Sequence, residues 1–259
     1  MGKYGDIREE FSDERTRILG ALEQEENRQV PLRLIGAQAF RTHCPKYGYI
    51  QDRLGRKFTD FDFVSYPRFV RDLRCILTEL GYEEDKQVTQ LFGDRRMLFR
   101  DPAFDRHTDV FLNVLDFCHP ISFVGRLEKD QPTVPLAELL LEKMQIVQIN
   151  EKDIIDSIML LREHPIGDTD AETINAAVVV GILAKDWGFW RTFTANFKLL
   201  DDKLAAYPSL SDEDRTVVHE RINDLQGRIA AAPKSLAWKA RAQIGERVKW
   251  YKDVEELER

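Results

Sequence analysis

Two aspartates separated by a single residue are the feature of this sequence with the clearest potential for chemistry. Asp60 and Asp62 lie in the segment 58–64, whose alternating pattern predicts a β-strand with both carboxylates on one face. Carboxylates held side by side repel each other unless a cation or a proton lies between them. Because Mg²⁺ binds one or two carboxylates together with substrate phosphates, the pair predicts a site for Mg²⁺ or Mn²⁺. A solvated acidic strand face is the simpler interpretation of the same spacing.

The residues before this strand predict a companion for the metal ion. A short apolar run over 32–35 predicts a strand, Gly36 permits a tight turn, and a helix is expected from Ala37. Backbone N–H groups at a helix N-terminus bind phosphate, so Gly36 and Ala37 are the expected nucleotide contacts. A phosphate site opposite a carboxylate pair suits a metal-bound nucleoside triphosphate.

A third carboxylate is expected on a neighbouring strand, where it would bind metal or accept a proton. The segment 108–117 is the most strand-like run in the chain, and it carries Asp109 and Asp116. Strand alternation places these two aspartates on opposite faces, so only one of them can be the third carboxylate of the site. Asp109 is favoured, and Asp116 is the alternative.

The elements around these residues predict an α/β (α+β) protein with a mixed sheet flanked by helices, followed by a C-terminal helical domain. The polar segment 42–57 is expected to be a loop, and residues 86–100 to form a hairpin at Gly93-Asp94. Strands are expected to cease beyond Gln131, and a capping box at Ser211 and Asp214 marks one later helix. The expected divisions are an N-terminal helix over 1–28, a core over 29–131 and a helical domain over 132–259.

Composition places the chain among globular proteins that do not span membranes. Hydrophobic residues make up 43% and charged residues 32% of the chain, and no apolar run approaches the ~20 residues that cross a bilayer. The net charge of −7 argues against non-specific coating of nucleic acid, which needs a basic face. Three scattered cysteines, Cys44, Cys75 and Cys118, and the absence of an apolar signal core predict a cytoplasmic protein with reduced thiols.

Taken in order, these residues resemble the DNA polymerase beta-like nucleotidyltransferases, and in particular the branch of abortive-infection nucleotidyltransferase toxins. The segment 34–40 looks like the family's glycine-rich turn and helix, 56–63 like its metal strand, and 108–111 like its third-carboxylate strand. Residues 140–144 and 152–156 resemble the lysine helix and the basic–acidic helix of that branch.

This resemblance implies an enzyme that transfers a nucleoside monophosphate from a triphosphate to an acceptor hydroxyl with Mg²⁺. Asp60, Asp62 and Asp109 would be the catalytic metal ligands, with Gly36, Ala37 and Lys143 as nucleotide contacts. The acceptor would be a small molecule, a protein or a tRNA, and an antitoxin partner is usual in this branch. Ala37 departs from the family, which usually has Gly or Ser there. The alternative is a nucleotide-binding module with little or no transfer activity that acts through a protein partner.

Three further features have competing interpretations. Lys143 lies among apolar residues, as a snorkelling lysine does. Asp156 is expected to pair with Lys152 one helical turn away, in preference to a catalytic role. A final helix over 235–258 concentrates cations and tryptophans that would suit an RNA acceptor, although tryptophans at such spacing more often pack into a core. A helical interaction protein with an incidental acidic strand is the third functional hypothesis.

Overall fold

The chain divides into two compact units. The computed structural model describes residues 7–24 and 26–254. The first unit is formed by Met1–Thr42, Lys57–Leu115 and Ser122–Val134, and the second by His43–Arg56, Asp116–Ile121 and Pro135–Arg259. The main division at residues 134 and 135 lies close to the expected junction. The N-terminal helix belongs to the sheet unit, and residues 43–56 belong to the helical unit.

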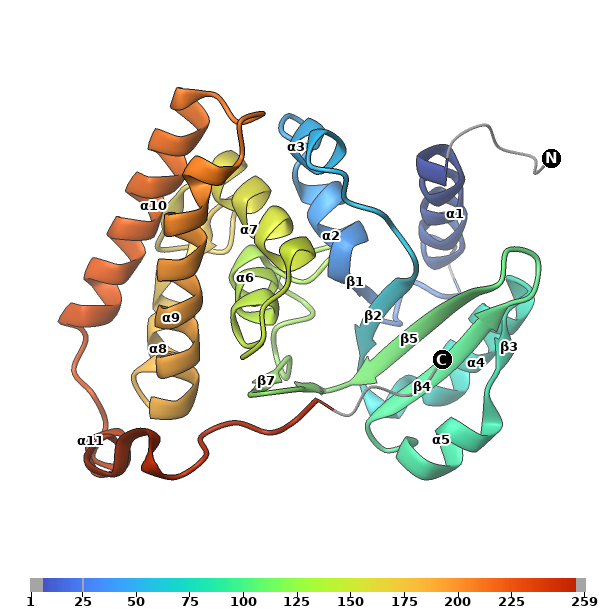
Figure 1. Cartoon of the computed structure of the whole chain (residues 1–259). Helices are drawn as coiled ribbons and strands as arrows, with labels where there is room; N and C mark the ends of the chain where they lie inside the picture. Colours follow the sequence, from blue (N-terminus) through green and yellow to red (C-terminus); the bar gives the residue numbers. More distant parts are fainter. Residues whose placement is uncertain (1–6, 25, 255–259) are drawn as a thin grey trace. The chain divides into compact units, whose positions relative to one another are not determined.

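A five-stranded mixed sheet forms the centre of the first unit (Figure 1). Strands β2 and β5 run parallel, whereas the other neighbours in the sheet run antiparallel. The mixed α/β class expected from the sequence is confirmed. In spatial order the strands are β1 (Arg33–Ile35), β2 (Phe61–Ser65), β5 (Arg106–Leu112), β4 (Arg96–Asp101) and β3 (Glu83–Glu84).

The two faces of β2 have different environments. Phe61 and Phe63 are fully buried, and the ring of Phe11 stacks on Phe61 with centroids 5.1 Å apart. Since Phe11 lies on α1 (Ile7–Leu22), this helix covers the aromatic face of β2 and leaves Asp62 on the opposite face. The helices of this unit are α1 (Ile7–Leu22), α2 (Gly36–His43), α4 (Val70–Glu79), which follows a 3₁₀ turn at Pro67–Phe69, and α5 (Lys86–Phe92).

Two expected strands of the first unit are wrong in part. Residues 86–92 form helix α5 and not one arm of a hairpin, because the Asp85 side chain accepts hydrogen bonds from the backbone N–H groups of Gln87 and Val88. The strand expected over 108–117 is interrupted at Asn113, which has a φ of 65°. A left-handed residue cannot continue an extended strand, so β5 ends at Leu112 and β6 (Val114–Asp116) begins a separate hairpin with β7 (Pro120–Ser122).

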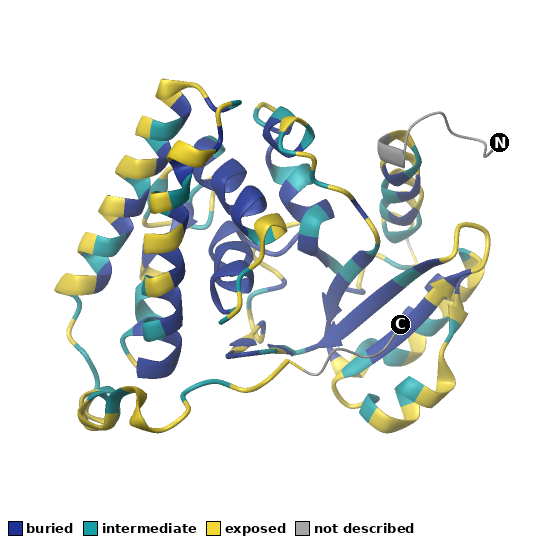
Figure 2. Cartoon of the chain, viewed as in Figure 1, coloured by how far each residue is buried: buried dark blue, intermediate teal, exposed yellow. Residues whose placement is uncertain are grey.

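The second unit is built mainly from helices around a buried centre. Helix α6 is buried along its whole length, as its dark blue ribbon shows (Figure 2). The long helix α10 (Asp212–Ala231) contacts α7 (Glu151–Glu163), α8 (Ala176–Leu183) and α9 (Trp187–Lys203). The helices of this unit are α3 (Tyr49–Arg53), α6 (Leu136–Met144), α7 (Glu151–Glu163), α8 (Ala176–Leu183), α9 (Trp187–Lys203), α10 (Asp212–Ala231) and α11 (Leu236–Ile244), with 3₁₀ turns at Leu204–Ala206 and Gly245–Arg247.

Local sequence signals explain several boundaries in this unit. The capping box of Ser211 and Asp214 at the start of α10 is confirmed. Three expectations are wrong. The segment 42–57, expected to be a loop, contains helix α3. Strands were expected to cease beyond Gln131, but two short parallel strands follow it, β8 (Ile166–Gly167) and β9 (Ile174–Asn175), and the last helix ends at Ile244 instead of 258. Gly245 ends that helix with a φ of 60°, a conformation that favours glycine.

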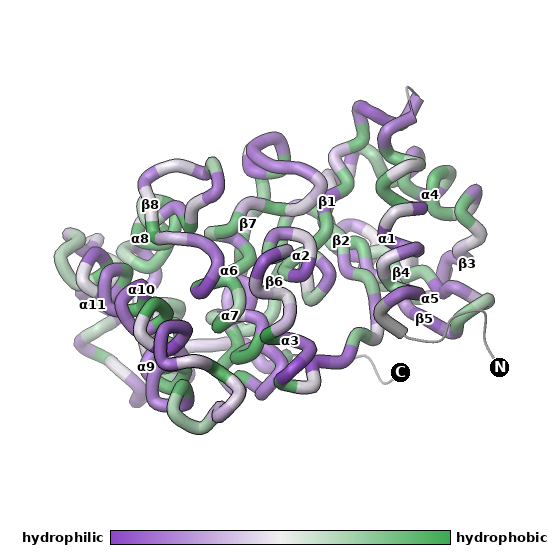
Figure 3. The backbone as a smooth tube through the Cα atoms, turned by 90° about the horizontal axis from the view of Figure 1, so that it is seen from above, coloured by the Kyte–Doolittle hydropathy of each residue, from purple (hydrophilic) through white to green (hydrophobic). Residues whose placement is uncertain are grey.

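Hydrophilic and hydrophobic stretches both occur along the helices and strands of the tube (Figure 3). Within residues 7–24 and 26–254, no helix combines the length and apolar character that a membrane crossing requires.

Candidate functional site

The turn from β1 into α2 brings the backbone against a carboxylate of β2. Ile35 and Asp62 are register partners on the antiparallel strands β1 and β2. Gly36 follows with a φ of 66°, and a Cβ atom placed on it would lie 2.7 Å from Asp62 Oδ2. Glycine adopts this conformation without strain, and a larger residue would also displace the Asp62 carboxylate, so the N-terminus of α2 begins beside this carboxylate. Ala37 is the second residue of the same helix.

A second aspartate lies directly beside Asp62. Asp62 and Asp109 are register partners on the parallel strands β2 and β5, and residues so paired point to the same face. Asp109 is 1% exposed, whereas Asp62 is half-buried. The competing Asp116 belongs to the second unit, where Lys252 Nζ lies 2.7 Å from both of its carboxylate oxygens. The structure therefore brings Asp109 next to Asp62 and gives Asp116 a different environment.

Asp60 lies just outside the strand on which it was expected. Strand β2 begins at Phe61, and Asp60 accepts a hydrogen bond of 3.0 Å from Thr59 Oγ1. No group of three or more histidine, cysteine, aspartate or glutamate side chains in the described part of the chain is close enough to hold a metal ion. Asp60, Asp62 and Asp109 therefore do not form a complete protein cage. A Mg²⁺ site at this face would take its remaining ligands from substrate phosphates and water.

An arginine that sequence reasoning missed completes the face. Arg96 Nε donates a hydrogen bond of 2.7 Å to Asp109 Oδ1, and the two side chains are 17% and 1% exposed. The Arg96 guanidinium carbon also lies 5.2 Å from the centre of the Phe111 ring. A carboxylate as buried as Asp109 needs such a partner, since an unpaired buried charge is costly. The repulsion between the two aspartates is thus reduced by a cation from the chain itself. No motif marks Arg96, because its position depends on the pairing of β4 with β5.

Lys143 lies in a separate charge cluster of the second unit. Its Nζ is 3.1 Å from Glu142 Oε1, 3.4 Å from Asp153 Oδ1 and 3.7 Å from Asp156 Oδ2. Burial by itself lowers the pKa of Lys143, but the carboxylates of Glu142, Asp153 and Asp156 outweigh it and raise this pKa above its ordinary value. The ammonium group is therefore charged and surrounded by carboxylates, unlike the solvent-facing end of a snorkelling lysine.

The expected pairing of Asp156 with Lys152 is wrong. Asp156 is fully buried, and its carboxylate accepts hydrogen bonds from Gln51 Nε2 at 2.8 Å and from Arg56 Nε at 3.1 Å. Gln51 lies on α3, the helix within the segment expected to be a loop. A buried carboxylate selects the partner that can be buried with it, whereas Lys152 is exposed on the helix surface.

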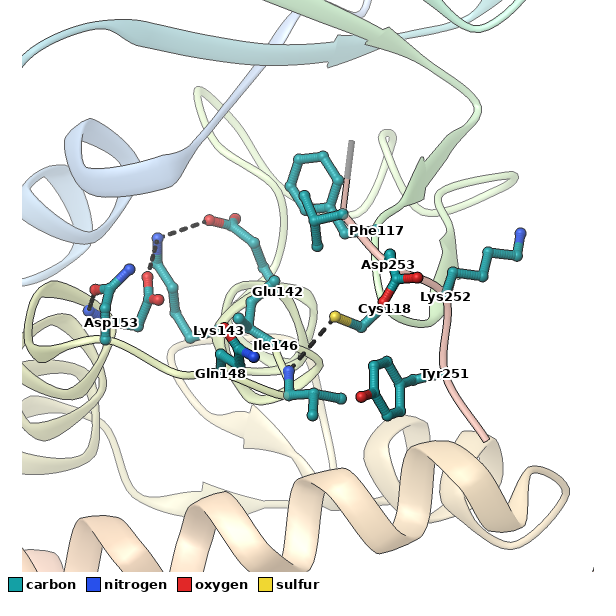
Figure 4. Close-up of a pocket in the computed structure, with 13 residues that line it drawn as sticks. Phe117, Cys118, Glu142, Lys143, Ile146, Gln148, Asp153, Tyr251, Lys252 and Asp253 are labelled. Carbon is teal, nitrogen blue, oxygen red and sulfur yellow. Dashed lines mark hydrogen bonds and ion pairs between the residues drawn. The ribbon is translucent and has the colours of Figure 1, made fainter. Parts of the chain in front are cut away.

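A pocket of about 600 Å³ opens beside this cluster in the second unit (Figure 4). Lys143, Glu142 and Asp153 line it together with Tyr251 and Lys252. Figure 4 shows the Lys143 amine joined to its carboxylate partners, so the charges of the lining are already paired.

The C-terminal cations and tryptophans contact other residues of the same unit. The Trp190 and Trp238 rings lie 5.1 Å apart, and Trp187 and Trp250 lie 6.3 Å apart. Arg241 stacks over the Trp187 ring at 4.7 Å, and Lys252 pairs with Asp116 as described above. These contacts favour packing over RNA binding for the tryptophans.

Comparisons with known proteins do not identify a family for this chain, since no family model, curated protein or solved structure matches it. The candidate site therefore depends on its own geometry, which unites Gly36, Asp62, Asp109 and Arg96 in the first unit.

Proposed function

We propose that this protein is a nucleotidyltransferase that uses Mg²⁺, or Mn²⁺, to transfer a nucleoside monophosphate from a triphosphate to an acceptor hydroxyl. The observation that carries the proposal is the approach of Gly36 to Asp62, at 2.7 Å for a Cβ placed on the glycine. It sets backbone donors for phosphate beside a carboxylate for a cation. The resemblance of the segments 34–40, 56–63 and 108–111 to nucleotidyltransferases supports the same function.

The residues of the first unit suit the donor side of this reaction. N–H groups at the start of α2, from Gly36 and Ala37, would bind phosphate oxygens, and Asp60 and Asp62 would hold the metal ion. When bound, Mg²⁺ would neutralise negative charge on the reacting phosphates and on the leaving pyrophosphate. The acceptor oxygen would form a bond to the α-phosphorus as the bond from that phosphorus to the β-phosphate oxygen breaks. The acceptor's proton would pass to a carboxylate or to water.

The carboxylates fit one metal ion more readily than two. Asp60 and Asp62 provide hard oxygen ligands of the kind that Mg²⁺ prefers. Asp109 Oδ1 accepts a bond from Arg96, so Asp109 would join the metal ligands through its other oxygen or after Arg96 moves. As a proposed catalytic residue, Asp109 therefore acts in a site whose charge is partly balanced by Arg96.

Transfer from labelled triphosphates tests this function. Each of the four nucleotides would be incubated with small-molecule, protein and tRNA acceptors, with Mg²⁺ or with a chelator. We expect metal-dependent labelling of one acceptor class, reduced at least about a hundredfold in Asp60→Asn and Asp62→Asn, a typical effect of removing groups that stabilise transition-state charge. The proposal would be contradicted if no acceptor were labelled, or if both variants labelled the acceptor as much as the wild-type protein does.

A second candidate is a nucleotide-binding module without turnover, and the Arg96–Asp109 ion pair favours it. An arginine that already neutralises Asp109 leaves less negative charge for a second metal ion. Calorimetry separates the two candidates, since tight triphosphate binding without product would identify the module. Either candidate would act in the cytoplasm, which agrees with Cys44, Cys75 and Cys118 forming no disulfide. An antitoxin would be the expected protein partner.

A further inference from the structure

Arg96 is held at the candidate site by one of its three nitrogens. Its Nε donates to Asp109 Oδ1, and its guanidinium carbon lies over the Phe111 ring, 5.2 Å from the ring centre. Within residues 7–24 and 26–254, Nη1 and Nη2 of Arg96 form no hydrogen bond. A guanidinium has five N–H donors, of which this arrangement uses one. The side chain is 17% exposed, so solvent and ligands reach it.

The register of the sheet places Arg96 in line with the other site residues. Arg96 pairs with Phe111 across β4 and β5, and Phe111 shares a face with Asp109 two residues earlier. Asp109 in turn pairs with Asp62 across β5 and β2, and Asp62 lies against Gly36 at the end of β1. Four consecutive strands thus supply backbone donors, a carboxylate, a second carboxylate and a guanidinium.

The order of these groups matches the charges of a metal-bound triphosphate. A metal ion would lie at the central carboxylates, and anionic phosphate oxygens would lie toward the donors on either side. A guanidinium that is fixed at Nε keeps its planar fork in one orientation and binds two phosphate oxygens at once.

We propose that Arg96 binds phosphate oxygens of the triphosphate and that Asp109 is the residue that positions Arg96. This inference rests on the proposed function only for the identity of the ligand as a triphosphate. It assigns Asp109 a role that needs no bound metal ion. Arg96 therefore contributes to phosphate binding both in the presence and in the absence of Mg²⁺.

Binding of inorganic tripolyphosphate in the presence of a chelator tests this assignment, because it removes the base, the sugar and the metal. We expect the wild-type protein to bind tripolyphosphate and Arg96→Gln to bind it at least about tenfold more weakly, the loss typical of a hydrogen-bonded charge pair. Arg96→Lys retains the charge without the fork and is expected to have intermediate affinity. Arg100→Gln is the matched control, since Arg100 lies on the same strand and bonds to Asp105 but is more exposed.

The outcomes separate this inference from the proposed function. Equal affinity of the wild-type protein, Arg96→Gln and Arg100→Gln overturns the inference, as does the absence of metal-free binding by the wild-type protein. Binding that depends on Arg96 without any nucleotide transfer supports the inference and contradicts the proposed function. Transfer with an unchanged KM for the triphosphate in Arg96→Gln contradicts the inference alone. If Arg96→Gln does not fold, as judged by circular dichroism, the comparison of Arg96→Lys with the wild-type protein decides the result.

Discussion

Two clusters of acidic and basic side chains, one in each unit, use the same residue types in different ways. In the first unit, Asp62 and Asp109 lie side by side on the neighbouring strands β2 and β5, and Arg96 bonds to Asp109 alone. In the second unit, the amine of Lys143 lies within 3.7 Å of three carboxylates, and Arg56 bonds to one of these, Asp156. The second cluster already contains a cation at its centre, whereas the first has its cation at one side.

The two clusters also differ in their exposure to solvent and in the backbone beside them. Asp62 is half-buried and lies against the turn at Gly36, whose φ of 66° is strained for a residue with a side chain. Asp156 is fully buried, and Glu142 and Lys143 are nearly so. Removing one member of a set of buried, paired charges is strongly destabilising, whereas a half-buried carboxylate beside the start of a helix suits a ligand. The comparison therefore assigns ligand binding to the first cluster and structural stability to the second.

The largest expected effect comes from removing the central cation of the second cluster. Lys143→Met would leave three carboxylates buried together, so we expect the free energy of unfolding to fall by about 3–5 kcal/mol. Urea denaturation followed by circular dichroism measures the loss. Lys198→Met is the control, because Lys198 forms an exposed pair with Asp202 and its loss should cost less than about 1 kcal/mol. Similar losses in the two variants would show that the Lys143 cluster is not structural.

A smaller effect is expected from adding ligand to the first cluster. Triphosphate with Mg²⁺ at 100 times its dissociation constant should raise the free energy of unfolding by about 2.7 kcal/mol. Asp62→Asn should lose most of this gain, whereas Asp116→Asn, whose aspartate pairs with Lys252 in the second unit, should retain it. Thermal unfolding with and without ligand provides the comparison. Retention of the full gain by Asp62→Asn would place the ligand elsewhere.

The smallest expected effect separates backbone strain from the close approach at Gly36. Gly36 and Gly81 both have positive φ values, of 66° and 86°, but only at Gly36 would a Cβ meet a neighbour, Asp62 Oδ2 at 2.7 Å. Gly36→Ala and Gly81→Ala should each lose about 1 kcal/mol of stability from strain. Only Gly36→Ala should also weaken Mg²⁺–triphosphate binding, by about tenfold or 1.4 kcal/mol, because the Asp62 carboxylate must rotate away. Calorimetry that finds equal affinities in both variants would remove Gly36 from the site.

The sequence predicted the parts of the site that depend on local spacing. The turn at Gly36, the strand that carries Asp62 and the strand that carries Asp109 follow from short patterns of apolar residues and glycine. Helix ends with a side-chain cap, such as the one at Ser211, could also be predicted from the sequence.

The errors arose where a single residue or a long-range contact decides the structure. Asp85 converts a strand-like sequence into helix α5 by capping it, and Asn113 divides one expected strand into two. Arg96 and Arg56 became recognisable only once β4 paired with β5 and α3 packed against α7. Partners of buried charges depend on tertiary packing, so local periodicity did not identify them.

Anomalous scattering from Mn²⁺ in crystals soaked with Mn²⁺ and a non-hydrolysable triphosphate tests the central claim most directly. The account predicts a Mn²⁺ peak within coordination distance of the Asp62 carboxylate and a phosphate group at the N–H groups of Gly36 and Ala37. A peak at Glu142 and Asp153, or no peak beside Asp62 with triphosphate bound elsewhere, would contradict it.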